Sequence, residues 1–81
     1  MASEDQTKKD ILWATANKFF PGWDTETGLT PDPWVIVKKN GVILEVHVPR
    51  TVPLIEFEEE TWWQFKRVRD DFELEQATPD E

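Results

Sequence analysis

The sequence predicts a small α+β protein with a helix, a β-hairpin and a second helix, in the order α-β-β-(β)-α. Apolar residues recur at helical spacing over residues 6–20 and again over 58–75, and two β-branched runs flank the dipeptide Asn40-Gly41. The 81 residues, 38% of them hydrophobic, suffice for one core but not for two. We therefore expect a single domain over residues 1–81, with tails at 1–6 and 76–81.

The first helix is predicted over residues 6–20, since its apolar residues fall on one broad stripe. Pro21-Gly22 ends it, because proline disfavours helical geometry in the residue before it. The stripe comprises Leu12, Trp13, Ala16, Phe19 and Phe20.

Residues 21–33 are expected to form a loop throughout. This segment holds three prolines, two glycines and three carboxylates, and it has neither a helical nor a strand period. Two interpretations remain open. The loop is either a connector held to the core by Trp23 and Leu29, or a functional loop of unusual length.

The hairpin over residues 34–48 is the strongest local signal. Asn40-Gly41 is typical of a two-residue type I′ turn, which sets Val37 opposite Leu44 and Val35 opposite Val46. Six aliphatic residues then share a core face, and the other face is mixed. The core face holds Val35, Val37, Val42, Leu44, Val46 and Val48, and the mixed face holds Trp34, Ile36, Lys38, Ile43, Glu45 and His47.

An isolated hairpin is only marginally stable, so something must cover or extend this one. A short third edge strand over residues 52–57 is one solution, although Pro49 and Pro53 disfavour it. Cover by the two helices is another, and a homodimer formed through the hairpin is the third.

The last helix is expected over residues 58–75, with an apolar stripe through Trp62, Phe65 and Phe72. It begins either with a capping box at Thr61–Gln64 or with Glu58–Glu60 as its first turn.

Enzymatic chemistry is disfavoured by the residue content. The chain has one His, one Ser and no Cys, which leaves no basis for a nucleophilic triad, and its three glycines form no phosphate-binding loop. Glu45 and His47 have ligand-like spacing, and a metal site there would need Asp24, Glu26 or Asp32 in addition. An ordinary half-exposed strand explains the pair more simply. We expect no enzyme activity, cofactor or metal.

Charge and tryptophan content point to a protein partner instead. Residues 56–81 hold ten acidic and three basic residues, so this segment carries nearly all of the net charge of −8. Such an acidic balance argues against direct nucleic-acid binding. Of the five tryptophans, Trp13 and Trp62 are assigned to the core, whereas Trp23, Trp34 and Trp63 are candidates for a binding surface.

The sequence thus predicts a cytoplasmic, non-enzymatic interaction protein. In size and charge it resembles the small acidic proteins, often phage-encoded, that bind and block a larger enzyme. The partner would present a basic surface, for instance a nucleic-acid site that the acidic face imitates. Solubility alone is the competing explanation of the charge, and an assembly subunit that oligomerises through its hairpin is the alternative function. The candidate partner-binding residues are Trp23, Trp34, Glu59, Glu60, Trp63, Asp70, Asp71, Glu73 and Glu75.

Overall fold

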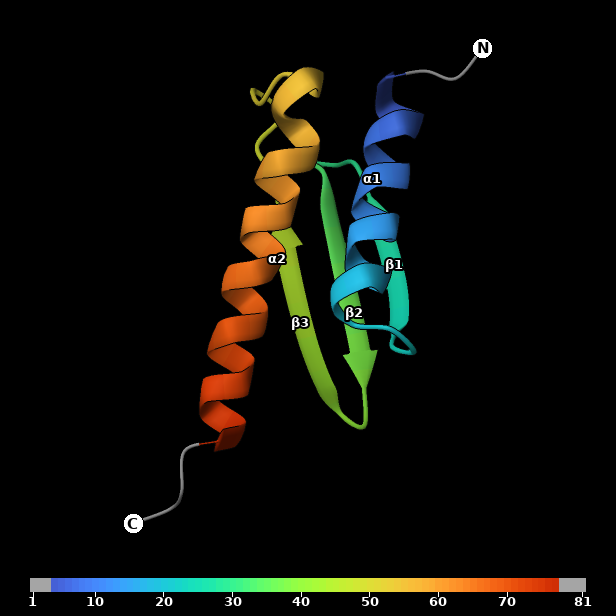
Figure 1. Cartoon of the computed structure of the whole chain (residues 1–81). Coiled ribbons are helices and arrows are strands. Elements are labelled where there is room, and N and C mark those ends of the chain that lie inside the picture. Colours follow the sequence, from blue (N-terminus) through green and yellow to red (C-terminus); the bar gives the residue numbers. More distant parts are fainter. Residues whose placement is uncertain (1–3, 78–81) are drawn as a thin grey trace.

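The computed structural model describes residues 4–77, which form two helices and three strands (Figure 1). The α+β class and the α-β-β-β-α order confirm the expected architecture. In chain order the elements are α1 (Glu4–Phe19), β1 (Asp24–Gly28), β2 (Trp34–Lys39), β3 (Val42–His47) and α2 (Leu54–Ala77).

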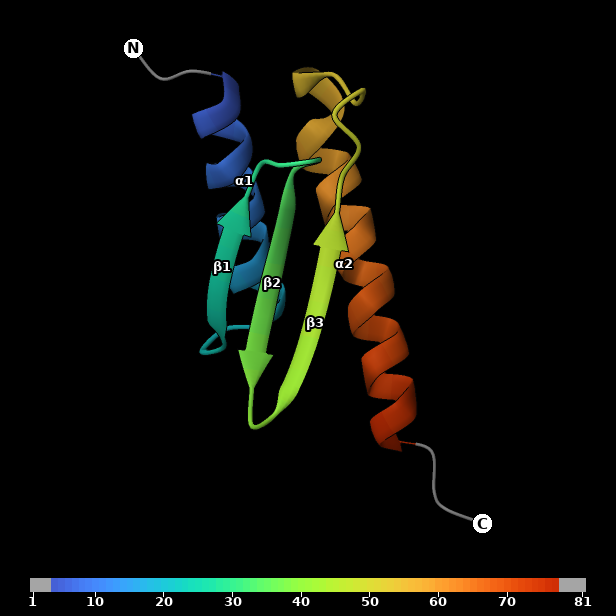
Figure 2. The same cartoon turned by 180° about the vertical axis from the view of Figure 1, so that it is seen from behind.

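The molecule has two layers, because both helices cover the same face of an antiparallel sheet with the strand order β1-β2-β3 (Figure 1). Helix α1 packs over β1 and β2, and α2 packs beside β3. The last turns of α2 run past the end of α1 and lie alongside the hairpin. The opposite face of the sheet carries no helix (Figure 2).

The hairpin forms with the predicted turn and register. Asn40 and Gly41 have φ values of 52° and 83°, as both centres of a type I′ turn require. Val37 faces Leu44 and Val35 faces Val46. The predicted core face is therefore correct: Val35, Val37, Val46 and Val48 are buried, and the two positions nearest the turn are half-buried.

Replacing Gly41 by valine is expected to lower the free energy of unfolding by at least about 1 kcal/mol, because a β-branched residue resists positive φ. No atom of residues 4–77 lies within 4 Å of the position that a Cβ would occupy, so the penalty comes from backbone strain. A urea melt measures the effect. An unchanged transition midpoint would contradict the turn assignment.

The prediction that residues 21–33 form a loop throughout is wrong, because Asp24–Gly28 form β1. Thr25 pairs with Val37 and Thr27 with Val35, so both threonines face the helices. The acidic residues that alternate with them, Asp24 and Glu26, are exposed. Threonine thus supplies the inward positions of an edge strand that contains no aliphatic residue.

The third strand therefore precedes the hairpin, and the alternative strand at 52–57 is wrong. A hydrogen bond from Val52 N to Pro49 O (3.1 Å) closes a turn before α2, and one from Glu56 N to Pro53 O (2.9 Å) lies in the first turn of the helix. The helix begins at Leu54, directly after a proline, whose fixed φ suits a helix start.

Both helices begin earlier than predicted. The capping box at Thr61 is wrong: Thr61 is fully buried in mid-helix, and its hydroxyl donates to Phe57 O (2.7 Å). Glu58–Glu60 likewise lie beyond the first turn, whose acidic residue is Glu56. Residues 4–6 belong to α1 and residues 76–77 to α2, while the rest of the expected tails, 1–3 and 78–81, lies outside the described residues.

The core lies between the helices and the sheet. Phe65 of α2 packs against Phe19 and Phe20, with ring centroids 6.0 and 6.1 Å away. The core assignment of Trp13 is wrong, since this residue is 55% exposed. Lys8 and Thr15 occupy inward positions of α1 instead. The buried hydrophobic residues are Leu12, Ala16, Phe20, Val35, Val37, Val46, Val48, Phe57 and Phe65.

Candidate functional site

The acidic residues of α2 do not share one face of the helix. Successive residues are rotated by about 100°, so Asp71 and Glu75 lie about 40° apart on one side of the helix, and Asp70 and Glu73 lie about 60° apart on another. Asp71 and Glu75 line a hollow beside β3, whereas Asp70 lines a hollow with Trp63, which Asp71 borders as well. The structure thus divides the predicted cluster between two surfaces.

The first surface is a groove of about 260 Å³ between α2 and the edge strand β3, which we call the acidic groove. Its apolar side chains come from both elements, and three carboxylates border them. The lining residues are Ile43, Leu44, Glu45, Val68, Asp71, Phe72 and Glu75. An apolar floor with an anionic border suits a long cationic side chain, whose stem is apolar and whose head is charged.

The acidic groove follows from the hairpin register and the position of α2. Because β3 is an edge strand, Leu44 can face α2 while its neighbours Ile43 and Glu45 point to the other side of the sheet. On its inner side, Phe72 makes edge contacts with Phe20 and Trp23. The distances between ring centroids are 6.4 Å to Phe20 and 5.7 Å to Trp23. The floor therefore rests on the aromatic part of the core.

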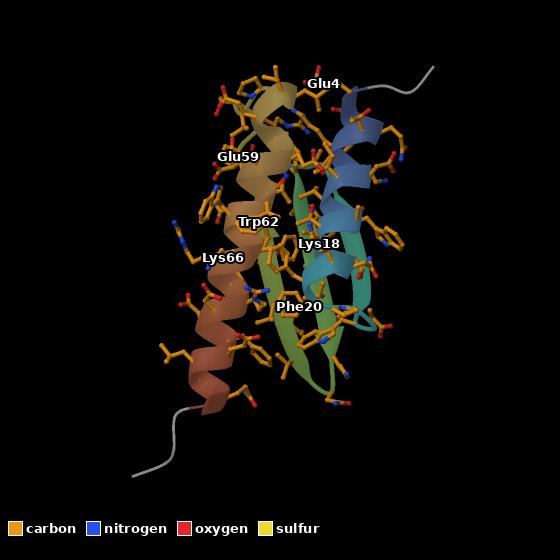
Figure 3. The ribbon with its side chains drawn as sticks, in the orientation of Figure 1. Glu4, Lys18, Phe20, Glu59, Trp62 and Lys66 are labelled. Carbon is orange, nitrogen blue, oxygen red and sulfur yellow. The ribbon has the colours of Figure 1, made fainter. Side chains whose placement is uncertain are left out.

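The second surface is the outer side of α2, around Trp63. This side chain is 54% exposed and borders a shallow hollow of about 340 Å³. Figure 3 shows Glu59 and Lys66 on this side of the helix, which is turned away from α1. The hollow is lined by Trp63, Lys66, Arg67, Asp70 and Asp71.

Charges on the outer side are mixed rather than acidic. Lys66 Nζ lies 2.8 Å from Asp70 Oδ2, and Arg69 reaches the other oxygen of Asp70 at 3.6 Å. The hydrogen bond from Lys66, aided by both cations, lowers the pKa of Asp70 below its ordinary value. Exposed i,i+4 pairs of this kind add little stability. They do neutralise the carboxylate beside Trp63.

The remaining candidates lie apart from both surfaces or near their ends. Trp23 is half-buried and packs on Phe20 with ring centroids 5.1 Å apart, so it serves the core and not an exposed binding surface. Glu60 accepts a hydrogen bond from Gln64 (2.9 Å). Glu59 is exposed on the outer side, one turn before Trp63.

Trp34 lies on the open face of the sheet, flat against Gly28 of β1. Its Nε1 donates to Thr30 O (3.1 Å), and its ring occupies the space into which a Cβ at position 28 would project. Gly28 is thus required for this contact.

Substituting Gly28 by alanine is expected to displace the Trp34 indole and break its hydrogen bond to Thr30. The loss of packing and of one hydrogen bond should lower the free energy of unfolding by about 1–2 kcal/mol. Tryptophan fluorescence should shift to longer wavelength as the indole becomes more exposed. A spectrum and a melting curve identical to those of the unmodified protein would show that the ring does not lie on Gly28.

The side chains considered for a metal site have other partners. Glu45 Oε2 lies 3.1 Å from His47 Nε2, while Glu26 pairs with Lys38 at 2.6 Å and thereby raises the lysine's pKa. Asp32 accepts a hydrogen bond from Arg50 N (3.3 Å). Within residues 4–77, no three His, Cys, Asp or Glu side chains gather as metal ligands. No described helix is long and apolar enough to cross a membrane.

Sequence reasoning missed the apolar half of the acidic groove. It identified Asp71 and Glu75 by charge but assigned Phe72 to the core stripe and Ile43 to the mixed hairpin face. The feature that could have revealed the groove was the edge of the second hairpin strand, because the end of a long helix must pack against this edge.

Comparisons with protein-family models, with curated proteins and with solved structures found no significant match to this chain.

Proposed function

We propose that this chain is a non-enzymatic, acidic protein-interaction module that inhibits or modulates a larger cytoplasmic protein. The acidic groove is the contact site in this proposal, and it takes a lysine or arginine side chain from a basic surface of the partner. One observation carries the proposal: Glu45, Asp71 and Glu75 border an apolar floor made by Leu44, Val68 and Phe72. The other two carboxylates of the predicted C-terminal cluster, Asp70 and Glu73, do not line the groove.

The chemistry favours a cation with a long stem. Its methylene groups would lie on the floor, and its charge would meet carboxylates from both α2 and β3. Asp71 and Glu75 together attract one cation more strongly than an isolated exposed pair, and Glu45, whose carboxylate lies 3.1 Å from His47 Nε2, adds to the local potential from the edge of β3. Arginine fits best, since its planar head can bridge two carboxylates.

The rest of the acidic surface would speed the encounter. The chain carries a net charge of −8, and long-range attraction raises association rates with a basic partner. A nucleic-acid-binding protein is a suitable partner class, because its binding surface is basic and selects anions. Binding should then weaken with salt, as exposed charges are screened over about 8–10 Å at physiological ionic strength.

Titration with a synthetic peptide that alternates arginine and glycine tests this proposal by isothermal calorimetry. The double variant Asp71→Asn/Glu75→Gln should weaken binding at least about tenfold, because only one groove carboxylate remains. Asp5→Asn/Asp10→Asn removes two exposed carboxylates from α1 and is the matched control, with the same net charge. Equal losses of peptide affinity in both double variants would show that only the net charge of the protein matters. That result would contradict the proposal.

A further inference from the structure

The outer side of α2 is complementary to itself, a property that the acidic groove does not use. Four residues at spacings of four, three and four form one stripe along this side, which we call the outer stripe. It consists of Trp63, Arg67, Asp70 and Leu74. Trp63 is 54% and Leu74 67% exposed, and both charged residues between them are exposed as well. This spacing is that of a helix seam in a coiled coil.

The order of residues in the outer stripe makes it complementary to an antiparallel copy of itself. An apolar residue stands at each end, and a cation and an anion stand in the middle. If two copies of α2 run antiparallel about a point midway between Val68 and Arg69, Trp63 meets Leu74 of the second copy. Arg67 then meets Asp70. By two-fold symmetry each contact occurs twice, as an isologous interface requires.

We infer that the outer stripe pairs with the outer stripe of a second copy, so that the protein forms an antiparallel α2–α2 homodimer. Leu74 of one copy would fill the hollow beside Trp63 of the other. Arg67 has no ion-pair partner within the described residues, and Asp70 of the second copy, which also contacts Lys66 and Arg69 of its own helix, would supply one. The apolar contacts lie about 16 Å apart along each helix, on either side of the charged centre.

Charge selects this register over its neighbours. A shift of three or four residues sets Arg67 against Arg67 or Lys66, or else Asp70 against Asp70 or Asp71. A parallel arrangement sets each charge against its own copy. Like charges placed directly opposite each other disfavour a pairing, so the register centred between residues 68 and 69 remains. Asp71 lines both the acidic groove and the hollow beside Trp63, whereas the other groove residues, Glu75 among them, lie outside that hollow.

Sedimentation velocity on the full chain at about 0.15 M salt tests the inference, since this ionic strength screens the repulsion between two copies of charge −8. We expect a dissociation constant of about 10–100 µM, as befits a small interface. Arg67→Asp and Asp70→Arg should each raise it at least about tenfold, because like charges then face each other. An equimolar mixture of the two variants should restore the dimer, as a heterodimer, since opposite charges meet again at both central positions.

Two further variants locate the interface. Glu73→Arg changes the net charge by the same amount as Asp70→Arg but lies off the outer stripe, so the dimer should persist. Ile43→Thr alters the hairpin face and should also leave the dimer intact.

A wild-type monomer at 1 mM would overturn the inference, as would single variants that dimerise normally or a mixture that stays monomeric. Loss of the dimer in Ile43→Thr would place self-association on the hairpin instead. Binding of the arginine-glycine peptide is measured separately, so that failure of the dimer and failure of the acidic groove can be told apart.

Discussion

Replacing Phe65 by alanine is expected to lower the free energy of unfolding by about 3–5 kcal/mol, a large part of the roughly 4–12 kcal/mol available to a domain of this size. Phe65 is 1% exposed and packs against Phe19 and Phe20 of α1. The substitution leaves a cavity where the two helices meet. A urea titration followed by circular dichroism measures the loss, and a substantial unfolded fraction without denaturant is the expected extreme.

Trp63→Ala is the matched control, two positions earlier on the same helix. It removes a larger side chain, but one that is more than half exposed and faces away from the sheet. The free energy of unfolding should fall by no more than about 1 kcal/mol, because the exposed ring loses only its edge contact with Trp62 (5.0 Å between centroids). If Trp63→Ala were as destabilising as Phe65→Ala, the assignment of inner and outer faces to α2 would be wrong.

The second large effect is expected at Trp23, where alanine should cost about 2–3 kcal/mol, because a half-buried indole loses edge contacts to two rings. Those rings belong to Phe20 and Phe72, with centroids 5.1 and 5.7 Å away. Phe72 also forms the floor of the acidic groove, so peptide binding should weaken together with stability.

Trp13→Ala provides the comparison for Trp23, since Trp13 is exposed on α1 and lies apart from the groove. Its unfolding midpoint and its affinity for the arginine-glycine peptide should both match those of the unmodified protein. A stable Trp23→Ala variant with weakened peptide binding would contradict the core position of Trp23 and return it to the list of direct contact residues.

The hairpin was predictable from sequence because its signals are local. Asn40-Gly41 sets the turn, and the turn then fixes which side of each strand is buried. No contact from elsewhere in the chain is needed to choose between registers. The predicted core face was correct for this reason.

Strand β1 and the inner face of α1 were not predictable in the same way. Thr25 and Thr27 become inward-facing only because β2 offers an edge to pair with, and residues 24–28 show no aliphatic alternation. On α1, Lys8 is buried with its ammonium 3.6 Å from Glu4 and over the ring of Phe57. A hydrophobicity pattern predicts that such a lysine is exposed and that Trp13 lies in the core, which is the reverse of what the structure shows.

For the site, charge identified the right helix but not the right surface. The acidic count selected Asp70, Asp71, Glu73 and Glu75 together, although only Asp71 and Glu75 face β3. The sequence suggested Glu45 only as a candidate metal ligand. In the structure this residue lies at the border of the same groove. The packing of α2 along the edge of the sheet decides this, and it is a tertiary property.

Chemical-shift mapping tests most directly whether the acidic groove is the binding site. The ¹⁵N-labelled protein is titrated with the arginine-glycine peptide, and the shift of each backbone amide is followed. The largest shifts should fall in residues 42–46 and 68–75, from the two sides of the groove. Shifts centred on residues 55–63, on α1 or on β1, with the groove amides unmoved, would contradict the proposal.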